Sequence, residues 1–170
     1  TFLIGDVNSA VALAIAQVSS EKKVLHVVSG GHTDGITGKD CHWNVYRVCN
    51  TTKMEANAVS DLLFKRYGKK WYFMTPDYAF GHTLQEAAAE NLKKFGGTML
   101  GNALAPLSTT DYSAYLIKAR AANPDVILVL QQGLDMVNVM KQIVQFGIDK
   151  QIHVAGLQLE LEAVEAMPPE

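Results

Sequence analysis

The glycine-rich segment at residues 29–35, SGGHTDG, combines residue types that can bind an anion or move a proton. Adjacent glycines let backbone N–H groups approach an anion closely. His32 and Asp34 could form an acid–base pair, but no Gly-x-Ser-x-Gly elbow or Cys/His partner accompanies them, which disfavours catalysis. The segment also matches neither the dinucleotide-binding glycine pattern nor a phosphate loop. An anion-binding loop and a plain turn between a strand and a helix both remain open for it.

Tyr78 and Phe80 lie in a second segment, DYAFG at residues 77–81, which directly follows the apolar run at 71–75. Either ring alone could belong to the core. Two rings in one loop at the end of a strand favour a wall on which a ligand stacks.

The histidines and cysteines give no metal signal. His26 lies inside an apolar run, so we expect it to be a core residue with a satisfied ring. The other three outside the glycine-rich segment, His42, His82 and His153, lack the spacing of metal ligands, so we expect them at the surface and expect no metal or cofactor.

Cys41 and Cys49 flank a stretch that includes the apolar run at 45–48. An extended stretch would separate them by ~20 Å or more, whereas a disulfide needs Cα atoms ~4.4–6.8 Å apart. An intrachain bond would therefore require a tight reversal at 42–44. That bond, pairing with a cysteine outside this sequence, and two free thiols all remain open.

Composition excludes several classes of protein. The 170 residues carry a formal net charge of −2, without the excess of Lys and Arg that nucleic acids or anionic membranes attract. The hydrophobic fraction of 48% is enough for a packed core. The longest apolar stretch, at 11–16, is far too short to span a bilayer, so we expect no direct insertion into a membrane.

Short apolar runs alternate with segments of helical periodicity. The runs are typical of strands covered on both faces, and they lie at 24–28, 71–75, 98–104, 126–130 and 152–155, with only a short extended piece at 45–48. Apolar residues three or four apart predict helices at 11–18, 54–62, 84–95, 112–119 and 136–143. We expect helix N-caps at Asn8 or Ser9, Thr51 or Thr52, and Thr110 or Asp111.

This alternation predicts an α/β fold with doubly wound parallel sheets. The alternation of strands and helices is interrupted only at 30–48. A boundary between two lobes, at 1–48 and 49–170, would explain this interruption. Ligands of such sheets bind at the carboxyl ends of the strands. We therefore expect the loops at 6–9, 29–33, 76–80, 131–133 and 155–158 to line one cleft between the lobes.

Six signatures in this order resemble the type I periplasmic binding proteins. They are GDVNS at 5–9 before an alanine-rich helix, VVSGG at 27–31, YR at 46–47, DYAFG at 77–81, TDYS at 110–113 and NPDVI at 123–127. The chain is most similar to the leucine/isoleucine/valine-binding group that serves ABC importers.

The resemblance implies two α/β lobes that are joined by three crossovers and close over a small solute by hinge motion. Relative to that family, the sequence lacks the opening of lobe 1 and the closing part of the molecule. Lobe 1 would be partial and lobe 2 nearly complete. The opening residues, TFLIG, are accordingly expected to be the end of a buried strand.

The resemblance also implies a ligand-binding set. Ser9, at the start of a helix, would bind the ligand carboxylate, and Gly30 would supply a backbone contact. His32 aligns with a hydroxyl position, with Thr33 beside it. Other implied contacts are the ring of Phe80 or Tyr78, Gln132 at a position that often carries tyrosine, and Gln158 at the position of an acidic residue that pairs with an α-ammonium.

We therefore expect an extracytoplasmic or periplasmic protein that delivers a small carboxylate, an amino acid or an aromatic or organic acid, to the membrane subunits of an ABC importer. An amide at Gln158 cannot pair with an ammonium, which favours a solute without one. Glu160 or Glu162 would serve if the alignment shifts. The alternatives are a ligand-sensing domain of a receptor or regulator and, less favoured, an α/β enzyme.

Overall fold

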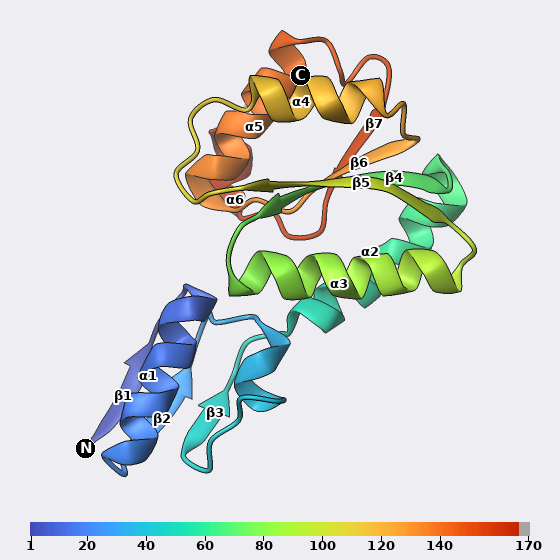
Figure 1. Ribbon diagram of the computed structural model, residues 1–170. Coiled ribbons are helices and arrows are strands. Elements are labelled where there is room, and N and C mark those ends of the chain that lie inside the picture. The colour runs from blue at the N-terminus through green and yellow to red at the C-terminus, as the bar shows by residue number, and fades with distance from the viewer. Residues whose placement is uncertain (167–170) are drawn as a thin grey trace.

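The computed structural model describes residues 1–166, which form two separate parallel β-sheets with helices packed against them (Figure 1). The smaller sheet contains β1 (Phe2–Gly5), β2 (Leu25–Val28) and β3 (Val45–Arg47), in that order. The larger sheet has the order β5 (Thr98–Ala105), β4 (Lys70–Pro76), β6 (Val126–Val129) and β7 (His153–Gly156). All recorded strand pairs are parallel, which confirms the predicted α/β class.

Helices cover both faces of the larger sheet (Figure 1). One face packs on α2 (Thr52–Tyr67) and α3 (Ala79–Lys94), and the other on α4 (Ser113–Ala121) and α5 (Gly133–Gln145). A short helix, α6 (Leu161–Glu165), contacts α5. Neighbouring residues of β4 face opposite cores: Trp71 and Phe73 pack toward α2 and α3, and Tyr72 and Met74 toward α4 and α5. Burial of both faces explains why the run is continuously apolar.

The smaller sheet is covered by α1 (Ser9–Glu21) and by the 3₁₀ helix η1 (Asp34–Thr37). Of these two, η1 was not predicted from the sequence. We expected residues 1–5 to end a buried strand. They do form β1, but Phe2 and Ile4 are 62% and 65% exposed. In the described residues β1 is an edge strand that pairs only with β2, and nothing covers these side chains, so burial of β1 in the whole protein stays a prediction.

The predicted helix starts are confirmed at α1 and α2 and are displaced at α4. Asn8 caps α1, and its side chain accepts hydrogen bonds from the amides of Ala10 and Val11. Thr51 caps α2. The N-cap of α4 is Tyr112, one residue later than expected. Asp111 still contributes, because its carboxylate accepts a hydrogen bond from the Ser113 amide at 2.9 Å.

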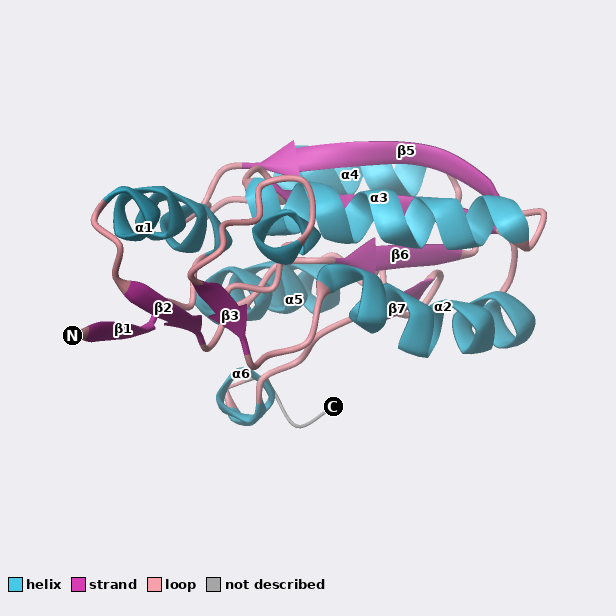
Figure 2. Cartoon of the chain, turned by 90° about the horizontal axis from the view of Figure 1, so that it is seen from below, coloured by secondary structure: helices cyan, strands magenta, loops and turns pink. Residues whose placement is uncertain are grey.

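Along the sequence, residues 48–69, which include α2, separate the strands of the smaller sheet from those of the larger sheet. The division into lobes at 1–48 and 49–170 stays a prediction, and residues 167–170 lie outside the described part of the chain. In Figure 2 the arrowheads of β5 and β6 point toward the end of the molecule that holds β1–β3. The loops that follow these strands therefore face the smaller sheet.

Candidate functional site

The strand order of the larger sheet creates a switch point between β4 and β6. The chain leaves β4 for β5 on one side and returns through β6 and β7 on the other. At such a point the loops diverge and leave a crevice, the usual ligand site of an open parallel sheet. The two loops that diverge here carry Tyr78 and Gln132.

A chain of hydroxyl groups joins the loops of the two sheets. The Ser9 hydroxyl accepts a hydrogen bond from the Thr33 amide at 3.1 Å. The hydroxyls of Thr33 and Thr83 lie 3.1 Å apart, and the Thr52 hydroxyl lies 2.9 Å from that of Thr83. Ser9 and Thr33 are each 1% exposed. The hydroxyl that the turn after β2 contributes is therefore that of Thr33, one residue after the aligned position, His32.

His32 contacts a glutamate that the sequence analysis did not single out. Its Nδ1 lies 2.6 Å from Oε1 of Glu55, at the start of α2, and the two side chains are only 14% and 4% exposed. Oε1 of Glu55 also accepts a hydrogen bond from the Asn50 amide at 2.7 Å. Asp34 instead accepts hydrogen bonds from the Thr52 hydroxyl and the Lys53 amide. An acid–base pair of His32 and Asp34 is therefore not formed.

Two amides and a phenol continue the network from Glu55. With its amide nitrogen turned toward Glu55, Gln158 donates to both carboxylate oxygens at 3.2 Å, and its amide oxygen accepts from the Gln132 amide at 3.1 Å. The Tyr78 hydroxyl lies 3.5 Å from Oε1 of Gln132. Side chains from α2 and from the segments after β4, β6 and β7 thus meet at this switch point. Glu160, the alternative acid, accepts a hydrogen bond from the Gly133 amide at 3.0 Å.

The rings of Tyr78 and Phe80 adjoin this network. Their centroids are 5.8 Å apart, and the Phe80 ring meets the His32 ring edge-on at 6.2 Å. Phe80 is 1% exposed and belongs to the core under α3, whereas Tyr78 is half-buried. Tyr78 is therefore the ring with surface left for a ligand.

Gly30 has a structural reason to be glycine. A Cβ at this position would lie 3.1 Å from the carbonyl oxygen of Asp6 and from the Cα of Val7. The loop after β2 therefore lies against the loop before α1, which holds Ser9 and Thr33 together.

Burial and nearby negative charge raise the pKa of Tyr78. Desolvation is the largest cause, followed by the carboxylates of Glu160, Asp135 and Glu55, and together they raise the pKa from its usual 10.0 to about 12. Below pH 10 the phenol is neutral in both the folded and the unfolded chain. As pH rises from 10 to 12 the unfolded chain ionises first, so the folded state should lose stability in this window.

Between about pH 9 and about pH 11.5, the free energy of unfolding should fall less for the Tyr78→Phe variant than for the unsubstituted protein. Urea denaturation at the two values measures the difference. The other tyrosines titrate in both proteins, so their contribution cancels. Equal losses would mean that the Tyr78 phenol is not shielded as described.

Other predicted features lie apart from the crevice. Cys41 and Cys49 are not bonded to each other in the described chain, where β3 lies between them. His26 is buried, and its Nε2 lies 2.7 Å from Oδ2 of Asp6. The histidines expected at the surface are partly or largely exposed; one of them, His82, lies 3.0 Å from an oxygen of Asp77.

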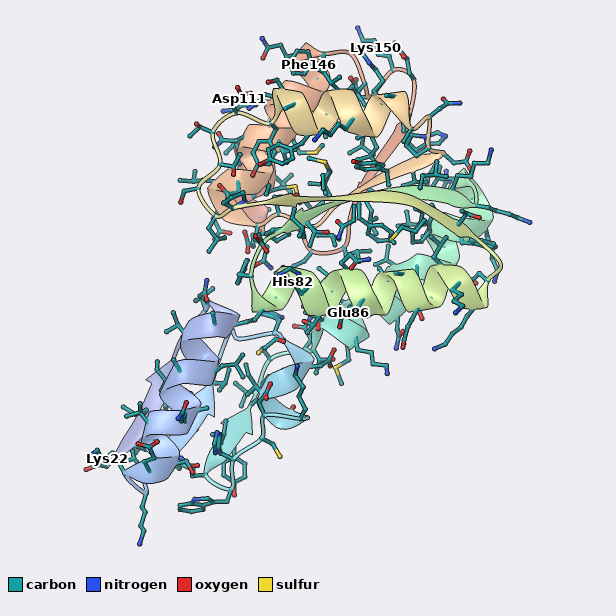
Figure 3. All side chains as sticks on the ribbon, viewed as in Figure 1. Lys22, His82, Glu86, Asp111, Phe146 and Lys150 are labelled. Atoms are coloured by element: carbon teal, nitrogen blue, oxygen red, sulfur yellow. The ribbon has the colours of Figure 1, made fainter. Side chains whose placement is uncertain are left out.

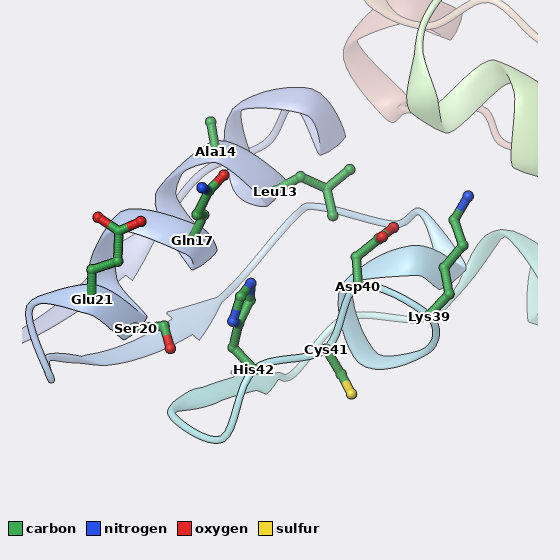
Figure 4. A pocket seen from close by; sticks show the side chains of 9 residues that line it. All are labelled: Leu13, Ala14, Gln17, Ser20, Glu21, Lys39, Asp40, Cys41 and His42. Carbon is green, nitrogen blue, oxygen red and sulfur yellow. The ribbon is translucent and has the colours of Figure 1, made fainter.

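An open pocket of about 700 Å³ lies between α1 and the loop that contains His42 (Figure 4). Its lining includes Glu21, Asp40 and Cys41, and none of the residues predicted to bind ligand. Within residues 1–166, no group of three or more acidic, histidine or cysteine side chains is placed to hold a metal ion.

A family model described as "Periplasmic binding protein" matches residues 1–170. The chain belongs to this family. Among curated proteins it matches Leu/Ile/Val-binding protein homolog 3 of Brucella melitensis, with 25% identity over 162 residues that cover 92% of this chain. The chain spans 40% of the length of that relative. These matches confirm the resemblance to the type I, leucine/isoleucine/valine-binding group.

Solved periplasmic binding proteins share the fold. One from Burkholderia mallei superposes with a TM-score of 0.94 at 34% identity, covering 98% of this chain and 44% of that one. A solute-binding protein of an ABC transporter from Rhodopseudomonas palustris, in complex with 3,4-dihydroxybenzoic acid, gives 0.82 at 28% identity, covering 91% and 42%. In the described part of this periplasmic binding protein, no helix has both the length and the apolar character to cross a bilayer.

Proposed function

We propose that this periplasmic binding protein captures a small carboxylate, an amino acid or an aromatic or organic acid, outside the cytoplasm and delivers it to the membrane subunits of an ABC importer. The observation that carries the proposal is the direct contact between the segment that follows β2 of the smaller sheet and two helices that cover the larger sheet, Thr33 with Thr83 and His32 with Glu55. Family membership supports the same role, because the similar proteins are solute-binding components of transporters rather than enzymes.

The proposal assigns residues 1–48 to one lobe and 49–170 to the other. The contacts between Thr33 and Thr83 and between His32 and Glu55 would then be contacts across the closed cleft or its hinge. Because Ser9, Thr33 and Phe80 are each 1% exposed, a solute would reach Ser9 only when the lobes separate.

Ser9 is proposed to hold the solute carboxylate. Asn8 already accepts hydrogen bonds from Ala10 and Val11 at this helix end. The Ser9 oxygen accepts from Thr33, which leaves the hydroxyl proton for an anion. The partial positive charge of the helix N-terminus adds to this attraction. Tyr78 would contact the apolar part of the solute, with Gly30, Thr33, Gln132 and Gln158 completing the site.

Calorimetric titration of the full-length protein with leucine, glutamate, benzoate and 4-hydroxycinnamate tests the proposal. We expect saturable binding of at least one of them. Ser9→Ala should weaken that binding about 10- to 100-fold, because a hydrogen bond to a charged group is worth about 1.5–3 kcal/mol.

Ser20→Ala is the matched control, since Ser20 lies near the other end of α1 and lines the separate pocket (Figure 4). It should bind like the unsubstituted protein. No binding of any of the four carboxylates, or equal losses in the two serine variants, would contradict the proposal.

A further inference from the structure

Glu55 is a buried carboxylate at the switch point, and the proposed function gives it no part in binding the solute. Its side chain is 4% exposed, although it lies in the first turn of a helix, where glutamates usually face solvent. Removing a charged group from water is costly unless partners compensate it. The partners recorded here are His32, Asn50 and Gln158.

These partners are distributed unevenly between the two oxygens. His32 and Asn50 both contact Oε1, at 2.6 and 2.7 Å, while among the described residues only Gln158 is recorded at Oε2, at 3.2 Å. A carboxylate offers about four acceptor positions. Oε1 is thus held in place from two sides, and Oε2 keeps capacity for another donor beside the half-buried Gln158.

Glu55 is one of three carboxylates, with Glu160 and Asp135, whose negative charge acts on Tyr78. The basic side chain recorded in contact with Glu55 is His32, which is charged only when protonated. With Ser9 proposed to hold the solute carboxylate, Glu55 would supply a negative charge to the same site. A solute with a carboxylate and an ammonium complements both groups.

We propose that Glu55 recognises the ammonium group of an amino-acid solute through Oε2, with Asn50, His32 and Gln158 holding its carboxylate in place. This inference rests on the proposed function and narrows it. The amide at Gln158 suggested a solute without an ammonium. However, the Gln158 amide donates a hydrogen bond to Glu55, so a carboxylate still lies beside position 158.

Pairs of solutes that differ only in the ammonium test the assignment: leucine against 4-methylpentanoate, and phenylalanine against 3-phenylpropanoate. In calorimetric titrations of the full-length protein, the amino acid of at least one pair should bind more tightly than its partner. Glu55→Gln keeps the shape and removes the charge. It should weaken the amino acid at least about 30-fold, the equivalent of about 2 kcal/mol for a buried charge pair, and leave the partner acid nearly unchanged.

A second variant separates recognition from folding. The double variant Glu55→Gln/Gln158→Glu returns the charge to the neighbouring position and should recover the preference for the amino acid. Glu86→Gln is the matched control, because Glu86 is an exposed glutamate on α3 (Figure 3). It should leave the preference intact. Thermal unfolding of each variant reports any loss of structure, which would weaken both members of a pair alike.

Tighter binding of the acids that lack an ammonium would overturn the role of Glu55 and leave the proposed function standing. The same holds if Glu55→Gln weakens both members of a pair equally. Failure of all four solutes and of the other carboxylates to bind would contradict both proposals.

Discussion

Replacing Gly81 with alanine should lower the free energy of unfolding by about 3 kcal/mol or more. Gly81 lies in the first turn of α3, where alanine would normally favour the helix by about 1 kcal/mol. However, its Cβ would overlap the carbonyl oxygen of Pro76 and lie 2.8 and 2.9 Å from carbons of the proline ring. A backbone oxygen in that position has to move, so the clash outweighs the helical preference.

The shift would also displace the loop that carries Tyr78. Chemical denaturation measures the stability change, and Gly156→Ala is the matched control, because a Cβ there meets only side-chain carbons at 3.4–3.5 Å. The control should change stability by less than about 1 kcal/mol. Equal effects of the two substitutions would show that the approach of α3 to Pro76 is not as close as described.

Replacing Phe80 with alanine should cost about 3–5 kcal/mol of stability. The ring is 1% exposed and packs in the core that α2 and α3 form on the larger sheet. Its removal leaves a cavity there and also takes away the edge contact with His32. Thermal and chemical unfolding would measure the loss.

Phe146→Ala removes the same ring from a position at the end of α5 that is 39% exposed (Figure 3). We expect this control to cost at most about 1 kcal/mol, because much of its ring is already in water. A loss at Phe80 no larger than that at Phe146 would place Phe80 outside the core and reopen its assignment as a ligand-facing ring.

The fold was largely predictable because its strands are buried on both faces. Val126 and Leu128 pack toward α2 and α3, while Ile127 and Val129 pack toward α4 and α5. Such a strand has to be apolar throughout, so the sequence reveals it directly. The edge strand β1 has the same apolar composition but is exposed, since its burial depends on what covers it rather than on its own residues.

The sequence predicted which loops lie near the switch point, whereas it did not predict the contact between Glu55 and His32. Thr52 and Glu55 fit the spacing of a capping box, in which the glutamate turns back to the helix end. The N-cap is Thr51 instead, which places Glu55 one residue further along the helix, where its carboxylate meets His32. A shift of one residue at the cap decides this contact, and propensity alone does not resolve it.

A crystal structure of the full-length protein with its solute bound is the most direct test of the central claim. We predict that the solute lies between the two sheets, with its carboxylate within hydrogen-bonding distance of the Ser9 hydroxyl and its apolar part against Tyr78. A solute bound anywhere else, for example in the pocket beside His42, with the crevice of Ser9, Glu55 and Gln158 closed and empty, would contradict the account.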